Sequence, residues 1–309
     1  MLSKIFLASI LTTAALGCAD HSNHLPHPHA RRDVPPEEVD PGRDVNDWTY
    51  EVSSDWAYIN PSEPNLPVNK YLDWSFSAHD IELHTDILGI GTEYALCQNG
   101  TQQAPVGLTS DQGFSEVHEP VFGNYEGNVT GTYYNWGYGP AFTPMYNKST
   151  IYSLPNLTFD GNTSYMVGWH THAPAEHPVN GKRSMAEIHF VHADTDGNYA
   201  GVLAMRIDPS GDIDSPFVSQ WPWTIGFNET RQLTNVQQDL DLALQEVVYF
   251  DNFWTYMGSL TVPPCKEGIR FFMAEQVLYV SNAQMQRILG MSAYSTRIEQ
   301  PIWLQGVNE

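Results

Sequence analysis

One short stretch of the chain places three histidines on two predicted strands. His170 and His172 are two residues apart, and side chains two apart on a strand face the same side, so both imidazoles point the same way. The Asn180-Gly181 dipeptide that follows is a strong hairpin signal. The chain then reverses, and His189 returns on a neighbouring predicted strand. The sequence therefore predicts three imidazoles that converge on one face of a β-sheet.

Three neutral histidines with no fourth protein ligand are typical of a catalytic zinc site with an open coordination position. Two carboxylates, Glu176 and Glu187, lie in the same stretch, residues 168–192. A His-x-His pair alone is weak evidence, because most histidines on strands face solvent or form hydrogen bonds in a core. The third histidine and the carboxylates favour a metal. The predicted Zn²⁺ ligands are His170, His172 and His189.

This stretch resembles the α-class carbonic anhydrases. These enzymes carry a His-x-His, a Ser/Ala-Glu-His, an Asn-Gly-Lys turn and a Glu-x-His-x-x-His in this order and at near-identical spacing. A second match, residues 258–268, resembles the family's Gly-Ser-Leu-Thr-Thr-Pro-Pro loop. The resemblance covers roughly residues 47–301. It implies a zinc lyase in which a zinc-bound hydroxide reversibly hydrates carbon dioxide to bicarbonate and a proton.

The resemblance also assigns roles to residues around the predicted zinc. Thr261 would accept the hydrogen bond of the hydroxide and pass its own proton to an ionised Glu176. Glu187 would bind the far ring nitrogen of His189 and fix its tautomer. An apolar wall would hold the substrate, and its predicted members are Val191, Val202, Leu260 and Val262.

Three positions depart from the family pattern. Gly168 stands where a glutamine usually supports the first ligand, and losing such a partner costs about 10–100-fold in metal affinity. Tyr138 occupies the position of the proton-shuttle histidine, and its ordinary pKa of about 10 is poorly matched to transfer at neutral pH. Val262 replaces a second threonine in the pocket. His118 or the segment 79–84 are the candidate substitutes for the shuttle.

Turn residues punctuate short segments rich in Val, Ile, Thr, Tyr and Phe, a pattern that favours a mainly β chain. Few stretches support a long helix: Asn235–Tyr249 is the best candidate, and Ser281–Leu289 is a second, shorter one. The resemblance implies one domain built on a large, central, twisted, mostly antiparallel sheet with a few short surface helices. Residues 61–93 are longer than the family usually has and form an excursion of unknown purpose.

The N-terminal region reads as targeting sequence. Residues 1–17 have the lysine, short apolar run and small residues of a secretory signal, and the run is too short to span a bilayer. Residues 18–46 form a polar leader, with propeptide cleavage expected near residue 32. A lipid-anchored Cys18 of bacterial type is the alternative. The catalytic domain is predicted to cover residues 47–309, with no transmembrane segment.

A eukaryotic secretory route is indicated by N-glycosylation sequons, which would be unusual by chance at this frequency. The sequons begin at Asn99, Asn128, Asn147, Asn156, Asn162 and Asn228. Together with the leader they suggest a secreted protein of fungal source. Of the three cysteines, Cys18 lies at the end of the signal and would be lost with it. Cys97 and Cys265 then remain as a pair in an oxidising compartment, which predicts one disulfide.

The net charge of −22 makes nucleic acid and anionic membranes poor partners, and it says nothing about the reaction. The sequence does not indicate an oligomeric state. Two other functions stay open. A cupin-type enzyme also uses His-x-His followed by a glutamate, with iron or manganese, but its Pro-x-Gly-x-x-His is missing here. A carbonic-anhydrase-like extracellular binding module normally lacks one of the three ligands, and all three are present.

Overall fold

The computed structural model describes Tyr50 and residues 94–309. The predicted signal, the leader and the 61–93 excursion lie outside the described residues, as does the candidate shuttle segment 79–84. Among the described residues, no helix is long and apolar enough to cross a membrane.

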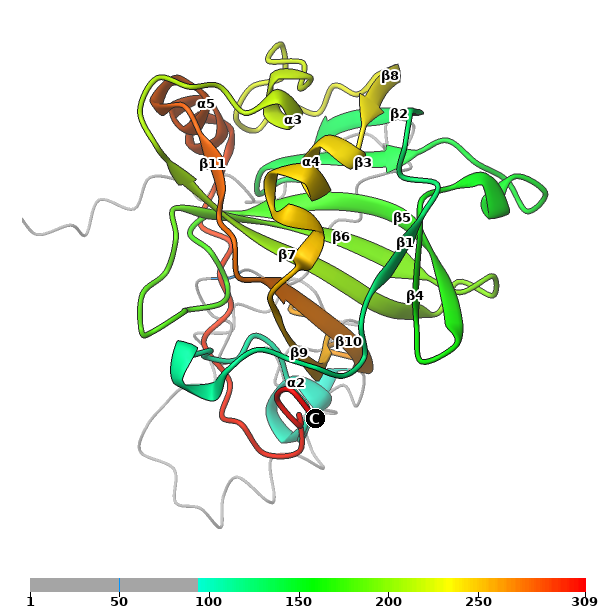
Figure 1. Ribbon diagram of the computed structural model, residues 1–309. Coiled ribbons are helices and arrows are strands. Elements are labelled where there is room, and N and C mark those ends of the chain that lie inside the picture. Colours follow the sequence, from blue (N-terminus) through cyan, green and yellow to red (C-terminus); the bar gives the residue numbers. More distant parts are fainter. Residues whose placement is uncertain (1–49, 51–93) are drawn as a thin grey trace, which may run out of the picture.

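Eleven strands form one large twisted sheet (Figure 1). The main path runs β8-β2-β3-β5-β6-β7-β10-β9, while β1 pairs with β4, β4 with β5, and β11 with β7. Only the β7–β10 and β7–β11 pairs are parallel among the described strands. The expectation of a mainly β, mostly antiparallel sheet is confirmed. The strands are β1 (Val121–Gly123), β2 (Asn128–Asn135), β3 (Pro140–Pro144), β4 (Asn156–Phe159), β5 (Asn162–His172), β6 (Ala186–Ala193), β7 (Tyr199–Pro209), β8 (Leu233–Asp239), β9 (Phe253–Ser259), β10 (Glu267–Ala274) and β11 (Leu278–Val280).

The helices of the described chain are short and lie at the surface of the sheet, as expected. The α-helices are α2 (Leu96–Asn99), α3 (Pro216–Ser219), α4 (Asp241–Glu246) and α5 (Asn282–Met291), and the 3₁₀ turns are η5 (Ser110–Gln112), η6 (Ile151–Ser153) and η7 (Val248–Phe250). Helix α5 confirms the prediction at 281–289. Ser281 caps it by accepting a hydrogen bond from the Gln284 N–H, and the Gln284 side chain bonds back in a capping box.

The predicted helix at Asn235–Tyr249 is wrong in its first half. Leu233–Asp239 is strand β8, which pairs antiparallel with β2, and α4 begins only at Asp241. The open edge of β2 offers backbone hydrogen bonds that this polar segment satisfies as a strand. Gln238 is buried there and accepts a 3.0 Å hydrogen bond from the Trp169 indole. Tertiary pairing, which periodicity does not report, decides the structure.

Because side chains alternate along each strand, one face of the sheet carries apolar core residues and the other carries the three histidines. Helices α3, α4 and α5 cover one face (Figure 1), and Trp169 and Phe190 project into the apolar core beneath them. Trp169 stacks on Trp221, with ring centroids 4.7 Å apart. The neighbouring positions, His170 and His189, therefore point to the opposite face.

Two further predictions concern covalent and turn geometry, and both are confirmed. Asn180 and Gly181 have φ of 52° and 71°, and Val179 and Lys182 exchange both backbone hydrogen bonds around them, as in a two-residue hairpin turn. The Cys97–Cys265 disulfide is formed. It ties α2 to the loop that follows β9.

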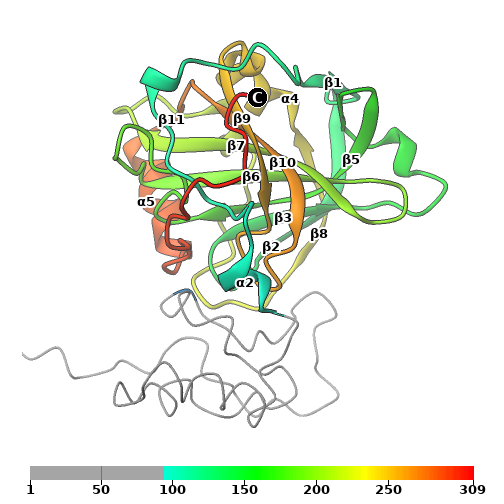
Figure 2. The ribbon, with the colours of Figure 1, turned by 90° about the horizontal axis from the view of Figure 1, so that it is seen from below.

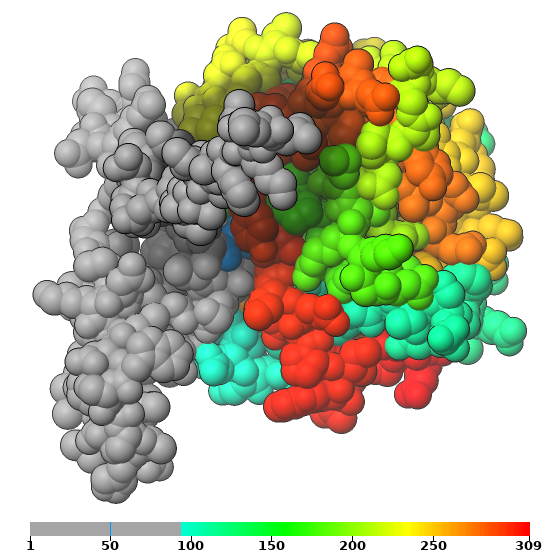
Figure 3. Space-filling view, turned by 90° about the vertical axis from the view of Figure 1, so that its left-hand side faces the viewer, coloured from blue at the N-terminus to red at the C-terminus, as the bar shows by residue number. Residues whose placement is uncertain are grey.

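The C-terminal segment closes the molecule on the β9 side (Figure 2). Its Gln305 carbonyl accepts from Met257, and its Asn308 N–H donates to Thr255, so the tail adds backbone hydrogen bonds to the outer strand β9. Nearer its start, Ser295 donates its N–H to the Ala173 carbonyl. The segment, red in Figure 3, thus reaches the end of β5, where His172 lies.

Candidate metal centre

The strand register brings the three predicted ligands together. His170 on β5 pairs directly with His189 on β6, and His172 pairs with Glu187. Ring centroids are 4.8 Å apart for His170 and His172, 5.5 Å for His170 and His189, and 4.7 Å for His172 and His189. One nitrogen from each ring lies within 4.8 Å of the other two. This is a cluster that one metal ion can occupy.

Two of the rings, those of His172 and His189, are oriented by groups that can accept hydrogen bonds but cannot donate them. His172 donates from Nδ1 to the Ser295 carbonyl at 2.7 Å, which leaves Nε2 without a proton. That Nε2 is buried and has no hydrogen-bond partner. His189 donates from Nε2 to Glu187 at 2.6 Å, which leaves its Nδ1 without a proton. Each ring therefore presents one lone pair to the cluster.

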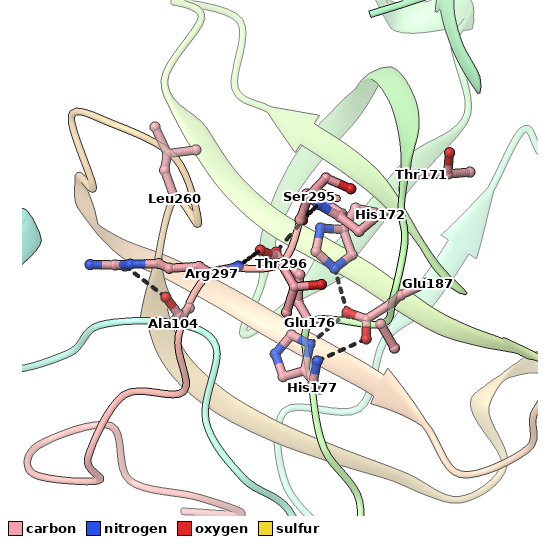
Figure 4. Close-up of polar contacts among 12 residues, drawn as sticks. Ala104, Thr171, His172, Glu176, His177, Glu187, Leu260, Ser295, Thr296 and Arg297 are labelled. Atoms are coloured by element: carbon pink, nitrogen blue, oxygen red, sulfur yellow. Dashed lines mark hydrogen bonds and ion pairs between the residues drawn. The ribbon is translucent and has the colours of Figure 1, made fainter. Parts of the chain in front are cut away.

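Glu187 accepts several hydrogen bonds beside the histidine cluster (Figure 4). Besides His189, it accepts from the backbone N–H of His177 at 3.0 Å and from the His177 Nδ1 at 2.6 Å. Burial opposes its charge, but His177 and His189 outweigh that effect and hold the pKa of Glu187 well below its usual range. The other ring nitrogen of His177 lies 2.6 Å from the Tyr256 hydroxyl. His177, Glu187 and His189 also form a possible metal group, but their facing atoms are already hydrogen-bonded to one another.

The protonation of the ligands suits a metal. Burial is the main cause that lowers the pKa of His172 to about 3, helped by the neighbouring His189. The His170 ring is partly exposed, yet the desolvation around it, with His172 and His189 beside it, lowers its pKa well below 6.5. Both rings are neutral at physiological pH, and neutral imidazole is the form that binds metals. The donor set fits a three-histidine zinc site.

Glu176 lies beside the cluster with one oxygen satisfied and one not. Its Oε1 accepts a 3.0 Å hydrogen bond from the Arg297 N–H, and the Arg297 guanidinium donates to the Ala104 carbonyl (Figure 4). The guanidinium also donates to the Cys97 carbonyl. Its Oε2 lies 3.6 Å from the His172 Nε2 and has no hydrogen-bond partner. Both atoms without a partner therefore face the same space.

Burial raises the pKa of Glu176 to about 7, and the Thr261 hydroxyl is among the groups that oppose this rise. Thr261 is itself buried. The two side chains are near each other without meeting the geometry of a formed hydrogen bond, since the carboxylate Oε2 remains without a partner. A donor placed in this space would complete the carboxylate.

The predicted pocket residues fall into two groups. Val191 and Val202 face each other across β6 and β7, and Leu260 packs in the same apolar cluster. Val262 instead packs in the cluster that holds Tyr138 and the two disulfide cysteines. Val191, Val202 and Leu260 thus share one apolar cluster, and Val262 belongs to another.

Aromatic rings occupy the predicted shuttle position. Tyr138 is buried, with its ring centroid 4.9 Å from Tyr50 and 4.9 Å from Trp136. Of the two alternatives, the segment 79–84 is outside the described residues. His118 is bound to Asp160, in the turn that precedes β5, at 2.7 Å. His170 lies eight positions along β5 from the first residue of the strand, Asn162, a span of roughly 25 Å, so His118 lies too far away to exchange protons with the cluster.

The sequon asparagines differ in accessibility. All but Asn156 are exposed. Asn156 is half-buried on β4, and its amide lies against Gly123, where even a Cβ on the glycine would come within 2.6 Å of it. Five sequon asparagines are thus exposed in the folded chain, and Asn156 is less accessible than these five.

Sequence reasoning missed three groups around the cluster. Ser295 contributes only a backbone carbonyl, for which no sequence signal exists. Tyr256 is an aromatic residue of strand β9, and nothing in the sequence distinguishes it from a core residue. Trp136 stands two residues before Tyr138, and its ring lies 5.2 Å from His170 and 5.6 Å from His172, contacts that its sequence neighbours do not reveal.

Comparison with known proteins gives consistent likenesses. Residues 91–302 match the family model for eukaryotic-type carbonic anhydrase. A carbonic anhydrase of Klebsiella pneumoniae is 27% identical over 224 residues, which cover 72% of this chain and 85% of that protein. An α-carbonic anhydrase of Thermovibrio ammonificans, solved with the inhibitor sulfanilamide, is 25% identical with a TM-score of 0.58 over 73% of this chain and 93% of that one. The fungal α-carbonic anhydrase of Aspergillus oryzae shares the fold, with a TM-score of 0.60, 22% identity, and coverage of 70% and 89%.

Proposed function

Because the chain belongs to the eukaryotic-type carbonic anhydrase family, we propose that it catalyses the reversible hydration of carbon dioxide to bicarbonate and a proton with Zn²⁺ as cofactor. The observation that carries the proposal is the space shared by His170, His172 and His189. Their nitrogens lie within 4.8 Å of one another, and the His172 Nε2 and the Glu176 Oε2 face that space without hydrogen-bond partners.

The three histidines would hold the zinc, and their neutral state leaves its double charge intact. When bound, the metal supplies a hydroxide nucleophile at neutral pH by acidifying water. Glu187 keeps the lone pair of His189 aimed at the site through the 2.6 Å hydrogen bond to Nε2, and the Ser295 carbonyl does the same for His172. Such outer partners set both ring orientation and basicity.

Thr261 and Glu176 would orient the nucleophile. The Thr261 hydroxyl would donate to the Glu176 Oε2, which has no hydrogen-bond partner in the structure, and could then only accept from the attacking group. This directs a lone pair of the nucleophile at the substrate, an orientation effect. Glu176 must be ionised to accept, and its Arg297 N–H bond at 3.0 Å favours that form.

Carbon dioxide, which is small and apolar, would rest against the wall of Val191, Val202 and Leu260, with Val262 at the border. The proton released must then reach solvent. Tyr138 is poorly suited to carry it, since its ring is enclosed by Tyr50 and Trp136. Buffer molecules that enter the site would take the proton instead.

The proposal includes export. A disulfide between Cys97 and Cys265 suits an oxidising compartment, which agrees with a signal peptide at 1–17, a leader over 18–46 and a catalytic domain over 47–309. Glycans would occupy the exposed sequons, and a fungal source remains a prediction. Carbon dioxide and bicarbonate are the expected partners.

The test is stopped-flow hydration of carbon dioxide with zinc analysis, for the wild type and two histidine variants. We expect one zinc per chain in the wild type. His189→Ala should lose both zinc and hydration, whereas His118→Ala, which changes a histidine bound to Asp160, should keep both. Zinc without hydration in the wild type would favour the binding module, and iron or manganese in place of zinc would favour the cupin chemistry.

A further inference from the structure

The three predicted ligands are not held in the same way. The Ser295 carbonyl fixes His172 and Glu187 fixes His189, both through short hydrogen bonds. The His170 ring forms no hydrogen bond with any residue that the structure describes, Tyr50 or 94–309. Position 168, two residues earlier on the same face of β5, is a glycine and offers no side chain. Something else must restrain His170.

Glycine at 168 follows from the close approach of β3. A Cβ there would lie 3.0 Å from the Phe142 carbonyl oxygen and 3.6 Å from the Thr143 hydroxyl. The first distance is shorter than ordinary van der Waals contact, and a backbone carbonyl in a paired strand has little freedom to move. A side chain at position 168 would therefore require β3 to shift slightly, and with glycine there the support for His170 has to come from another residue.

Trp136 is the one ring other than the two remaining ligands that contacts His170 among the described residues. The ring centroids lie 5.2 Å apart at an angle of 64°, an edge-to-face contact. Such contacts stabilise a pair of aromatic rings beyond what the buried area alone contributes. The Trp136 ring also lies 5.6 Å from the His172 ring, so its indole contacts both histidines of the His-x-His pair.

The indole is itself fixed. Its Nε1–H donates to the Thr171 carbonyl at 3.1 Å, on the strand that carries both histidines. The Trp136 N–H donates to the Gly139 carbonyl at 3.1 Å, which closes the turn between β2 and β3. The preceding Asn135 is buried and bonds to the Met291 carbonyl at 2.8 Å. A side chain held at both its backbone and its ring end can restrain a neighbour.

We propose that Trp136 is the positioning residue of His170, which holds by edge-to-face packing the ligand that lacks a hydrogen-bonding partner. The proposal rests on the proposed zinc site. It makes metal retention by this chain depend on a tryptophan of the β2–β3 turn. The indole restrains the ring of His170 without selecting its tautomer, because its only polar group, the Nε1–H, donates to the Thr171 carbonyl and not to His170.

The test measures zinc affinity of the full chain by competition with a chelator, together with the melting temperature of the zinc-free protein. Trp136→Ala should weaken zinc binding at least 10-fold, the lower end of what lost support of a ligand usually costs. Trp136→Phe keeps a ring over His170 and should restore most of the affinity. Trp303→Ala removes a tryptophan that is 62% exposed and should leave affinity unchanged.

The outcomes separate the two proposals. Loss of affinity in Trp136→Ala with rescue in Trp136→Phe supports the positioning role. Wild-type affinity in Trp136→Ala, or affinity losses in both variants that merely parallel their melting temperatures, overturns it. A wild type that fails to bind zinc overturns the proposed function itself. A Trp136→Ala chain that does not fold leaves Trp136→Leu, which keeps an apolar side chain without a ring, to give the same comparison with Trp136→Phe.

Discussion

His170 lies directly opposite His189 across strands β5 and β6, and the next inward pair on this face is His172 with Glu187. The pairing register of β5 and β6 therefore places two ligands, His170 and His172, opposite the third ligand, His189, and the carboxylate that supports it, Glu187. Because the side-chain period of a strand is two, a slip of one residue would turn His189 and Glu187 to the helix-covered face. The Asn180-Gly181 turn, with its two cross-strand hydrogen bonds, lies in the connection between these strands.

Replacing Thr261 by valine keeps the shape of the side chain and removes its hydroxyl. We expect kcat/KM for hydration to fall about 100-fold, the size of effect that lost orientation of a reacting group produces. Zinc content should not change, because Thr261 is not among the ligands. Thr158→Val, on the distant strand β4, is the matched control. Equal rates in the two variants would remove Thr261 from the mechanism.

Proton export should depend on buffer. Tyr138 is enclosed by aromatic rings, and His118 is bound to Asp160 far from the cluster. We therefore expect kcat at pH 7.5 to rise with the concentration of an imidazole buffer until another step limits it. A rate that is independent of buffer down to the lowest usable concentration would show that the chain has its own shuttle.

His192 should make stability depend on pH. Burial lowers its pKa from 6.5 to about 3, and its Nε2 lies 2.7 Å from the Tyr125 hydroxyl. Between these two values the unfolded chain binds the proton and the folded chain does not, so stability falls as the pH falls. Between pH 7 and pH 5 this one group should cost about 2 kcal/mol of unfolding free energy.

Denaturant unfolding of the zinc-free wild type and of His192→Gln, at both pH values, checks this expectation. The difference in stability between the two proteins should shrink by that amount at pH 5, because glutamine does not titrate. Using zinc-free protein keeps metal release out of the comparison. Parallel pH profiles would mean that His192 is protonated to the same degree in the folded and unfolded chains.

The Cys97–Cys265 disulfide should contribute strongly to stability, since it links residues 168 apart in sequence. The chain-entropy model gives roughly 5 kcal/mol for such a loop, and measured losses run about 2–5 kcal/mol. The double variant Cys97→Ser/Cys265→Ser should unfold at correspondingly lower denaturant concentration. Reductant should destabilise the wild type and leave the double variant unchanged. Equal stability of the two oxidised proteins would contradict the prediction.

The sequence predicted those parts of the centre that are local or carried by side chains with a specific pattern. His170, His172 and His189 were found because alternation and one turn place them together, and α5 was found through its Ser281 cap. The Ser295 carbonyl lies 123 residues beyond His172, and a backbone acceptor leaves no trace in residue type. Such a contact exists only once the chain has folded.

The remaining misses have the same origin. Residues 235–239 have no strong strand pattern, and the edge of β2 makes them a strand. Trp136 acquires its contact with His170 because the β2–β3 turn folds over the end of β5, which its sequence neighbours do not reveal. Local patterns thus located the metal ligands, while long-range packing determined what surrounds them.

The most direct test of the central claim is a zinc titration of the metal-free protein, followed by the initial rate of carbon dioxide hydration. The rate should rise in proportion to added zinc and level off at one zinc per chain, and the His172→Ala protein should stay at the uncatalysed rate throughout. A wild type that takes up one zinc per chain and still hydrates no carbon dioxide would contradict the proposed function.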